Sequence, residues 1–250
     1  MTKNEFNIVI PSRFGSGRFP GKPLHPLNGK AMILHVVDRA RESDAANIVV
    51  ATDDQRIADV CADVAVEVEM TDASHVSGTD RIAEVATRRG WSDDCVIVGL
   101  QGDEPATPAH LLNQLSANLH TFGYANMATF CKSVSSVEDY RNSHRVKVVR
   151  DHRNMALYFS RASIPARREN GTADGFPESF IHIGLYAYRC AYLKQFSRLS
   201  PALIEQEEQL EQLRVLYNGG RIHVDLVEEV AAGVDHPDDV ADVEALLKRL

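Results

Sequence analysis

The chain has 250 residues, of which 44% are hydrophobic, and this favours one α/β domain with a sizeable core over two equal domains. Its 27 Lys and Arg against 35 Asp and Glu give a formal charge of -8, which argues against generic attraction to nucleic acid or to an anionic membrane surface. Any phosphate site must therefore be local. The first ten residues mix charged side chains with a short apolar run, so neither a signal peptide nor a membrane insertion is predicted.

The cysteines predict neither a zinc site nor a disulfide framework. Cys61, Cys95, Cys131 and Cys190 form no CxxC pair and have no compact spacing with histidines. We therefore expect a cytoplasmic protein.

The first half of the chain alternates short apolar runs with segments of helical period, which is typical of a mostly parallel sheet with helices on both faces. The predicted strands are 7–10, 48–52, 66–70 and 96–100. The predicted helices are 32–41, 55–64, 79–89 and 108–120, the last with a proline in its first turn. Gly29 and Lys30 are predicted to form a turn before the first helix.

After residue 125 the rhythm changes. Strand-like runs at 127–131, 146–149 and 183–188 are not cleanly separated by helices, and 166–179 is predicted to be an exposed excursion. A helix at 201–218, a strand at 222–226 and a helix at 238–250 complete the chain. We expect a mixed extension of the sheet that carries a dimer contact.

The segment after the first strand, PSRFGSGRFPGK at 11–22, combines three glycines with three cations. Glycines let backbone N–H groups approach an anion, and cations neutralise it, so the segment suits phosphate. It is not a Walker A loop, because Ser16 and Pro23 stand where that motif needs Gly and Ser or Thr. It is not the dinucleotide fingerprint, because Pro20 replaces the third glycine. A solvated surface loop is the alternative, but ligands bind where this loop emerges, beyond the carboxyl ends of parallel strands.

A bound triphosphate needs a cation, and Mg²⁺ is usually held by one or two carboxylates plus phosphate oxygens. Asp103 follows the 96–100 strand and is the first candidate ligand, although Gly-Asp before a proline is also an ordinary turn. Asp235 is the second candidate. Asp238 and Asp239 are explained by the dipole of the helix that follows them.

Blocks spread over the whole chain resemble the 3-deoxy-manno-octulosonate cytidylyltransferases, which activate the sugar acid Kdo as CMP-Kdo for lipopolysaccharide synthesis. The blocks are PSRFGSGRFPGKPL at 11–24, VATDD at 50–54, SGTDR at 77–81, QGDEP at 101–105, ALYFSRASIP at 156–165, HIGLY at 182–186, LEQLR at 210–214 and GVD at 233–235. The resemblance implies a Rossmann-like, mostly parallel mixed sheet of the nucleotidyltransferase (glycosyltransferase-A-like) type. It also implies a single cytidylyltransferase domain over 1–250, with an acceptor and dimerisation region at about 125–220.

The resemblance implies these site residues. Arg13 and Lys22 contact the triphosphate, Ser77, Gly78, Thr79 and Arg81 lie near the nucleotide, and Gln101 lies between nucleotide and sugar. Asp103 and Asp235 hold Mg²⁺, and the catalytic set is Arg13, Lys22, Asp103 and Asp235. The acceptor residues are Arg161, His182, Tyr186, Glu211 and Gln212, of which the arginine suits the acceptor's carboxylate.

Two acceptor residues also have ordinary explanations. His182 alternates with apolar neighbours, as a hydrogen-bonded structural histidine does. Glu211 follows Glu205, Glu207 and Glu208 on a predicted helix whose acidic face need only be solvated. One position departs from the family pattern: Ile181 stands where Lys or Arg is usual, which is compatible with a changed acceptor.

The expected reaction is attack of the anomeric hydroxyl of Kdo on the α-phosphorus of CTP, with release of pyrophosphate, in a homodimer. Alternatives are a cytidylyltransferase for 8-amino Kdo, for another 2-keto sugar acid such as a sialic-acid-like sugar, or for a polyol phosphate. A nucleotide-binding regulator without catalysis is a further alternative, which the retention of both Asp103 and Asp235 disfavours.

Overall fold

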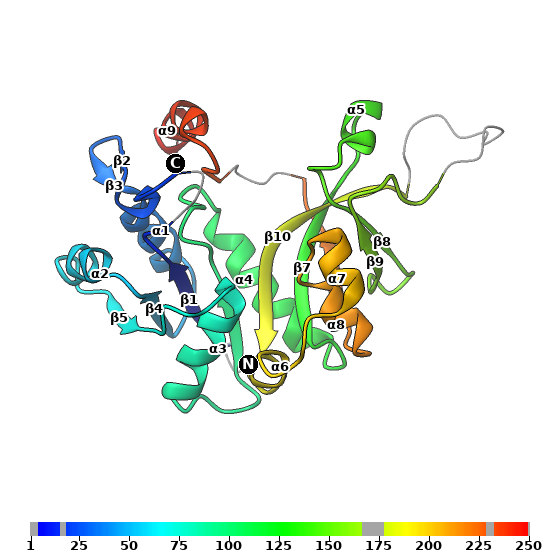
Figure 1. Ribbon diagram of the computed structural model, residues 1–250, viewed down its shortest axis with the longest axis horizontal. Helices are drawn as coiled ribbons and strands as arrows, with labels where there is room; N and C mark the ends of the chain where they lie inside the picture. The colour runs from blue at the N-terminus through cyan, green and yellow to red at the C-terminus, as the bar shows by residue number, and fades with distance from the viewer. Residues whose placement is uncertain (1–4, 16–18, 167–177, 229–232, 250) are drawn as a thin grey trace. The chain divides into compact units, whose positions relative to one another are not determined.

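A computed structural model describes residues 5–15, 19–166, 178–228 and 233–249 (Figure 1). The chain divides into two compact units. Unit 1 comprises Met1–Ala117, Ala187–Ser197 and Val230–Leu250, and unit 2 comprises Asn118–Tyr186 and Arg198–Glu229. Strand β10 (Phe180–Arg189) begins in unit 2 and ends in unit 1. That the whole chain acts as one domain stays a prediction.

Unit 1 is built on a parallel sheet. Its strands β1 (Phe6–Ser12), β4 (Asn47–Thr52), β5 (Glu67–Met70) and β6 (Val96–Gly99) lie in the order β6-β1-β4-β5. All seven residues of β1 are buried, because a central strand of a parallel sheet is covered on both faces. The four strands predicted for this half of the chain are thereby confirmed.

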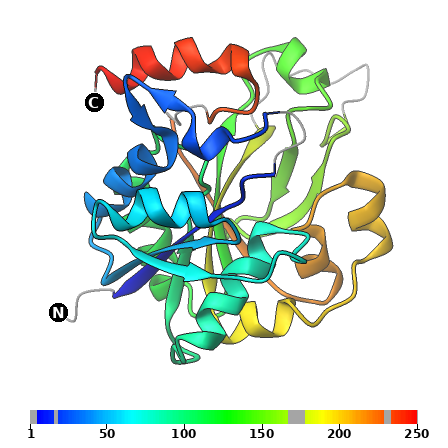
Figure 2. The same cartoon turned by 60° about the vertical axis from the view of Figure 1, so that its left-hand side comes forward.

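Three helices link these strands, as Figure 2 shows for the blue and cyan part of the chain. They are α1 (Met32–Arg41), α2 (Gln55–Ala62) and α3 (Gly78–Arg88). The chain moves outward from β1 to β4 and β5, then returns through α3 to β6. Right-handed crossovers therefore place α1 and α2 on one face and α3 on the other. The helices on both faces are as expected.

The remaining elements of unit 1 are short. The predicted turn at Gly29 closes a hairpin of β2 (Pro26–Leu27) and β3 (Lys30–Ala31), with Asn28 and Gly29 at positive φ. The last helix starts as a 3-10 turn, η2 (Pro237–Asp239), and continues as α9 (Val240–Leu247). Helix α6 (Cys190–Phe196), which was not predicted, follows β10, and α4 (Ala109–Thr121) leads toward unit 2.

Unit 2 contains the mixed part of the sheet. β11 (Ile222–Leu226) pairs in parallel with β7 (Met127–Ser133), while β8 (Lys147–Arg150) pairs antiparallel with both β10 and β9 (Ala156–Ser160). The mixed extension is confirmed, although β9 and the short helix α5 (Val137–Arg141) were not predicted. The predicted excursion at 166–179 lies mostly outside the described residues.

The prediction of one helix at 201–218 is wrong. Two helices, α7 (Leu203–Glu208) and α8 (Leu213–Tyr217), are separated by residues 209–212, the first of which, Gln209, has a φ of 53°. A left-handed residue ends a helix because the backbone turns away from its axis. The carbonyls of Glu208 and Gln209 instead accept hydrogen bonds from Arg161. Helical period alone does not reveal such a distant partner.

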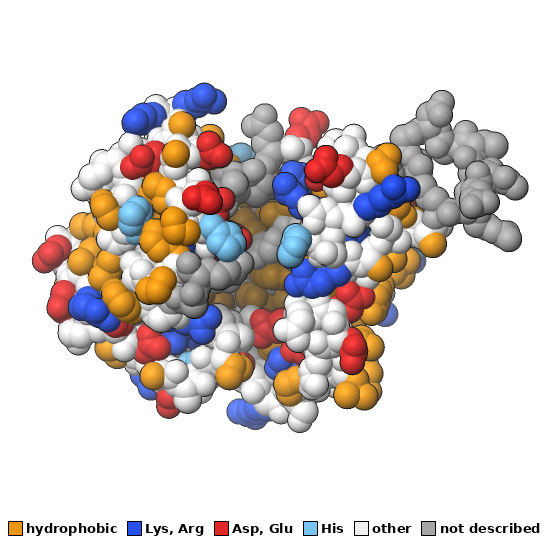
Figure 3. All heavy atoms as spheres, turned by 45° about the horizontal axis from the view of Figure 1, so that its top comes forward, with side chains coloured by type: hydrophobic (Ala, Val, Ile, Leu, Met, Phe, Trp, Pro, Cys, Tyr) orange, Lys and Arg blue, Asp and Glu red, His pale blue; other side chains and the backbone are white. Residues whose placement is uncertain are grey.

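In the described ranges no helix is both long and apolar enough to cross a bilayer. On the face drawn in Figure 3, acidic and basic side chains are interspersed.

Candidate active site

The loops that follow β1 and β6 meet at one edge of the unit 1 sheet. β1 and β6 are parallel neighbours with Val9 opposite Gly99, so their carboxyl ends point the same way. The amide of Gly102 then donates to the carbonyl of Pro11 over 3.3 Å. A Cβ at Gly102 would meet that carbonyl at 3.1 Å, so the glycine permits the close approach. The predicted juxtaposition of these two loops is confirmed.

A cavity of about 220 Å³ opens at this edge. Its walls come from the loop after β1, the start of α3 and the loop after β6. Arg13, Lys22, Ser77, Gly78, Arg81, Gln101 and Asp103 all line it, together with Pro11, Ser12, Pro23, His75, Val76 and Gly102. Three arginine or lysine side chains thus face a single carboxylate, which makes the cavity suitable for a polyanion.

The glycine- and arginine-rich loop folds back on itself. The amide of Gly21 donates to the carbonyl of Phe14 over 3.1 Å. The guanidinium of Arg56 stacks over the Phe14 ring, 3.4 Å from the ring centroid. Gly21 has φ 73°, and a Cβ there would meet the Phe14 ring at 3.1 Å. The loop is therefore anchored on both sides of residues 16–18, which lie outside the described residues.

The N-terminus of α3 contributes the second wall. Ser77 caps the helix by accepting from the amide of Asp80 over 3.1 Å, and a Cβ at Gly78 would meet the Gln101 amide at 3.4 Å. Helix N-termini present free N–H groups and a positive dipole end to anions. Ser77, Gly78 and Gln101 are thus brought together as expected.

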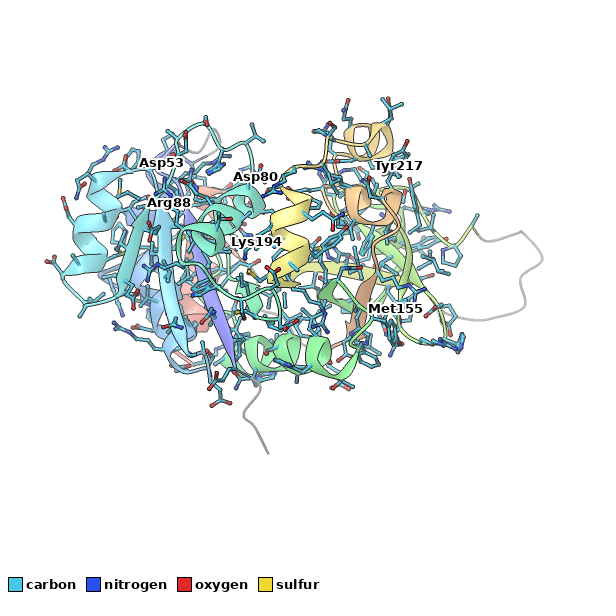
Figure 4. The ribbon with its side chains drawn as sticks, turned by 90° about the horizontal axis from the view of Figure 1, so that it is seen from below. Asp53, Asp80, Arg88, Met155, Lys194 and Tyr217 are labelled. Atoms are coloured by element: carbon cyan, nitrogen blue, oxygen red, sulfur yellow. The ribbon has the colours of Figure 1, made fainter. Side chains whose placement is uncertain are left out.

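Two other predicted nucleotide residues have structural contacts. Thr79 is buried, with its hydroxyl 3.5 Å from the hydroxyl of Tyr188. Arg81 lines the cavity, but its guanidinium donates to Thr71 and to Asp53, the latter over 3.0 Å. Figure 4 labels Asp53 in this unit. Arg81 therefore ties α3 to the segment after β4 as well as adding charge to the cavity.

Lys22 joins three segments that are far apart in sequence. Its Nζ donates to Oδ2 of Asp103 over 2.5 Å and to the carbonyl of Val234 over 2.7 Å. The Lys22 side chain is 10% exposed and that of Asp103 36%, so the ion pair is partly shielded from water. The amide of Val234 in turn donates to the carbonyl of Asp103 over 2.9 Å. These contacts place the 233–235 segment, and with it Asp235, beside Asp103.

The carboxylates here create a negative potential. Burial raises the pKa of Glu104 to about 8, and the neighbouring Asp103 and Asp235 carboxylates add to this shift. Carboxylate oxygens are the ligands that Mg²⁺ prefers, so Asp103 and Asp235 fit this cation. Within the described segments no group of three or more His, Cys, Asp or Glu could hold a metal.

Two residues of this region escaped the sequence interpretation. His75 lines the cavity, and its Nε2 lies 2.5 Å from Oε2 of Glu84 on α3. The same carboxylate accepts from the amide of Asp72 over 3.0 Å and pairs with Arg88. Glu84 thereby fixes the segment before Ser77. The sequence shows a histidine two residues before the SGTDR block. Without the contact to Glu84, that histidine does not indicate a functional role.

The predicted acceptor residues lie in unit 2, and His182 and Tyr186 come together on β10 with ring centroids 5.4 Å apart. Nε2 of His182 lies 3.1 Å from Oγ1 of Thr129. The Thr129 hydroxyl donates its single proton to the carbonyl of Ile183 or Leu185. In the contact with His182 the hydroxyl must therefore accept, so Nε2 of the histidine carries the hydrogen. Nδ1 is then the acceptor of the ring.

The other acceptor residues surround the break between α7 and α8. Arg161 directly follows β9, and its guanidinium donates to the carbonyls of Glu208 and Gln209. Gln212 is buried at the start of α8, next to Glu211. Ile181, the departure from the family pattern, is 4% exposed and packs with Val134 and Tyr140. Its position in an apolar cluster gives no reason for a changed acceptor.

The half-buried imidazole of His182 predicts a loss of stability in acid. Burial lowers the pKa of His182 to about 3, whereas the unfolded chain has the ordinary value of about 6.5. Below pH 6.5 the unfolded state therefore binds more protons, and the free energy of unfolding falls. The contribution at pH 5 is roughly 2 kcal/mol at most.

Urea denaturation at pH 7 and pH 5 measures this effect. The wild type should lose more stability than His182→Asn between these pH values, and His152→Asn, at an exposed position, should behave like the wild type. Parallel loss in the wild type and His182→Asn would contradict the assignment.

An α/β fold with a cation-lined cavity beside a carboxylate pair at the edge of its parallel sheet defines a nucleotidyltransferase. Comparison with known proteins agrees with this class, because a model of the family described as cytidylyltransferase matches residues 7–223. The chain is 49% identical to the 3-deoxy-manno-octulosonate cytidylyltransferase of Thioalkalivibrio sulfidiphilus (strain HL-EbGR7), over 97% of this chain and 99% of that protein. It is 48% identical to the enzyme of the same name from Alkalilimnicola ehrlichii (strain ATCC BAA-1101 / DSM 17681 / MLHE-1), over 97% and 96%. The chain therefore belongs to the family of 3-deoxy-manno-octulosonate cytidylyltransferases.

Solved structures support the same assignment. The structure of CMP:2-keto-3-deoxy-manno-octonic acid synthetase complexed with CTP superposes with a TM-score of 0.90, at 38% identity and 98% coverage of both chains. A 4-diphosphocytidyl-2C-methyl-D-erythritol synthase shares the fold, with a TM-score of 0.64 at 12% identity and coverage of 97% and 98%.

Proposed function

We propose that this chain transfers CMP from CTP to the anomeric hydroxyl of Kdo, giving CMP-Kdo and pyrophosphate for lipopolysaccharide biosynthesis. The observation that carries the proposal is the cavity where Arg13, Lys22 and the N-terminus of α3 converge next to Asp103. The names of the relatives supply the nucleotide and the sugar acid, since a CTP complex is among the similar structures.

The residues of unit 1 bind and orient the nucleotide. The triphosphate lies against Arg13 and Lys22, whose charges neutralise it, and against the N-terminus of α3 at Ser77 and Gly78, where backbone N–H groups donate to it. Gln101, fixed against Gly78, contacts the nucleotide with its amide. Because Lys22 pairs with Asp103 in this structure, CTP binding offers this lysine a second anionic partner. No protein nucleophile is needed, since alignment alone contributes about 7 to 11 kcal/mol in favourable cases.

Asp103 and Asp235 are the residues that hold Mg²⁺ in this proposal. The raised pKa of Glu104 beside them and the tether through Val234 support the assignment. When bound, Mg²⁺ supplies Lewis-acid stabilisation of phosphate charge and a lowered pKa for the acceptor hydroxyl.

The residues of unit 2 bind the acceptor. Arg161 is proposed to meet the carboxylate of the sugar acid. His182, neutral at pH 7 because burial lowers its pKa, accepts a hydrogen bond from a sugar hydroxyl through Nδ1. Tyr186, Glu211 and Gln212 supply further hydroxyl, carboxylate and amide contacts.

Pyrophosphate release with CTP and Mg²⁺ across a panel of acceptors tests the proposal. We expect turnover with Kdo to exceed that with 8-amino Kdo, a sialic acid or a polyol phosphate. Faster turnover with 8-amino Kdo than with Kdo would identify 8-amino Kdo as the acceptor. CTP binding without any release of pyrophosphate would indicate a nucleotide-binding regulator.

A homodimer is proposed as well. Unit 2 exposes large apolar side chains: Leu157 on β9 is 61% exposed, Leu203 on α7 74%, and Tyr217 on α8, labelled in Figure 4, 63%. Sedimentation velocity should give twice the mass of one chain, and a monomer at micromolar concentration would refute this proposal.

A cytoplasmic location is supported by the four cysteines, all of which are free thiols, as is usual in a reducing compartment. Cell fractionation checks it: the chain should follow cytoplasmic markers, and recovery with the membrane or periplasm would refute it.

A further inference from the structure

The break between α7 and α8 is held by one carboxylate that belongs to neither the expected nucleotide set nor the expected acceptor set. Oε1 of Glu208 accepts from the hydroxyl of Ser160 over 2.6 Å, and Oε2 accepts from the amide of Arg161 over 2.8 Å. Ser160 is 2% exposed. Glu208 is the last residue of α7, and Ser160 is the last residue of β9. The carboxylate therefore fastens the end of a helix to the end of a strand.

The side chain of Arg161 also links the end of β9 to the break after α7, this time as the hydrogen-bond donor. Its Nε donates to the carbonyl of Glu208 over 2.7 Å, and Nη2 donates to the carbonyl of Gln209 over 3.3 Å. Nη1 reaches the carbonyl of Ser143 over 3.2 Å. A guanidinium has five N–H donors, so within the described residues these contacts fix its plane and leave two donors for a ligand.

The backbone of Arg161 is held as well. Its carbonyl accepts from Nζ of Lys147 over 2.8 Å, and that lysine is fully buried, with its other contacts on the carbonyls of Asn142 and Arg145. Both the main chain and the side chain of Arg161 are therefore set by neighbours rather than by solvent.

We propose that Glu208 is a positioning residue for the acceptor: it fixes the direction of Arg161 and the backbone turn that presents Glu211 and Gln212. This inference rests on the proposed function and adds a determinant of acceptor affinity that itself does not touch the sugar. Glu211 follows Gln209 by only two residues. The amide of Leu213, the first residue of α8, donates to the carbonyl of Leu210. A shift of the turn therefore moves both candidate ligands together.

Substitution at Glu208 separates this role from general stability. Glu208→Ala removes the acceptor of two partly buried donors and should raise KM for Kdo about tenfold or more. KM for CTP should stay within about twofold, because the nucleotide residues belong to unit 1. Glu208→Gln should recover most of the Kdo affinity, since an amide can accept from Arg161 and donate to Ser160. Glu207→Ala, at the exposed neighbour on α7, is the matched control.

The measurement is pyrophosphate release at varied Kdo with saturating CTP, and the reverse, with the thermal midpoint of each variant recorded. If Glu208→Ala does not fold, Ser160→Ala carries the test, with an expected rise in KM for Kdo of about threefold and an unchanged KM for CTP. Equal KM values for Kdo in the wild type and the folded variants, or equal rises for both substrates, would overturn the inference. A wild type that releases no pyrophosphate with Kdo would instead refute the proposed function.

Discussion

Replacing Asp103 with asparagine is expected to lower kcat/KM by about 100-fold or more, since a metal-bound carboxylate supports several kcal/mol of charge stabilisation in phosphoryl chemistry. The carboxylate lies next to Lys22 and to the segment that carries Asp235. Asparagine has the same shape but no charge, so the fold should persist while the affinity for Mg²⁺ falls. The loss should be largest at limiting Mg²⁺ and partly recovered at high Mg²⁺.

Steady-state rates over a Mg²⁺ titration measure this effect. Asp94→Asn is the matched control, because Asp94 is exposed in the turn before β6, away from the cavity. A thermal midpoint within a few degrees of wild type would confirm that Asp103→Asn folds, although Lys22 loses its ionic partner. Wild-type activity of Asp103→Asn at limiting Mg²⁺ would refute the metal assignment.

Replacing Gly233 with alanine is expected to reduce both activity and stability, although Gly233 is not among the predicted ligands. A Cβ at this position would meet the carbonyl oxygen of Asp103 at 2.9 Å and Cγ of Glu104 at 3.4 Å. The nearer neighbour is a backbone atom and not the end of a flexible side chain, so the 233–235 segment must move. The movement would strain the bond of Val234 to Asp103, the contact of Val234 with Lys22, and the position of Asp235.

Overpacking of this kind costs typically about 1 to 3 kcal/mol, and about 2 to 4 °C per kcal/mol is usual for a chain of this size. The melting temperature should therefore fall by several degrees, and kcat/KM should fall by about tenfold or more if Asp235 is displaced. Gly123→Ala, where a Cβ would find nothing within 4 Å, is the control and should match wild type in both. Unchanged melting and unchanged rates in Gly233→Ala would show that this segment is not part of the site.

The parallel half of the fold followed from the sequence because its signals are local. Buried strands of a parallel sheet are continuous apolar runs, and amphipathic helices repeat every 3.6 residues. The helix at Met32–Arg41 and the strand at Ile222–Leu226 occur with the predicted bounds. The meeting of Pro11 and Gly102 also followed, since neighbouring parallel strands deliver their loops to one edge.

The helix break at Gln209 did not follow, because its cause is tertiary. A solvated surface is the ordinary alternative for the acidic residues Glu205, Glu207 and Glu208, but only Glu207 is exposed. Glu205 is 8% exposed and forms an ion pair with Arg214 over 2.5 Å, and Glu208 binds the end of β9. Sequence spacing carries no information about a partner nearly fifty residues away.

The family, the parallel core and the residue types that gather at the site, a glycine loop with cations and two aspartates, could all be read from the amino-acid sequence alone. Those properties depend on composition, periodicity and motifs read along the chain. The folded chain was needed to show that Lys22 joins Asp103 to the Asp235 segment, that Ile181 lies in an apolar cluster, and that Glu208 holds Arg161. These are pairwise contacts between distant segments, and their geometry exists only once the chain is folded.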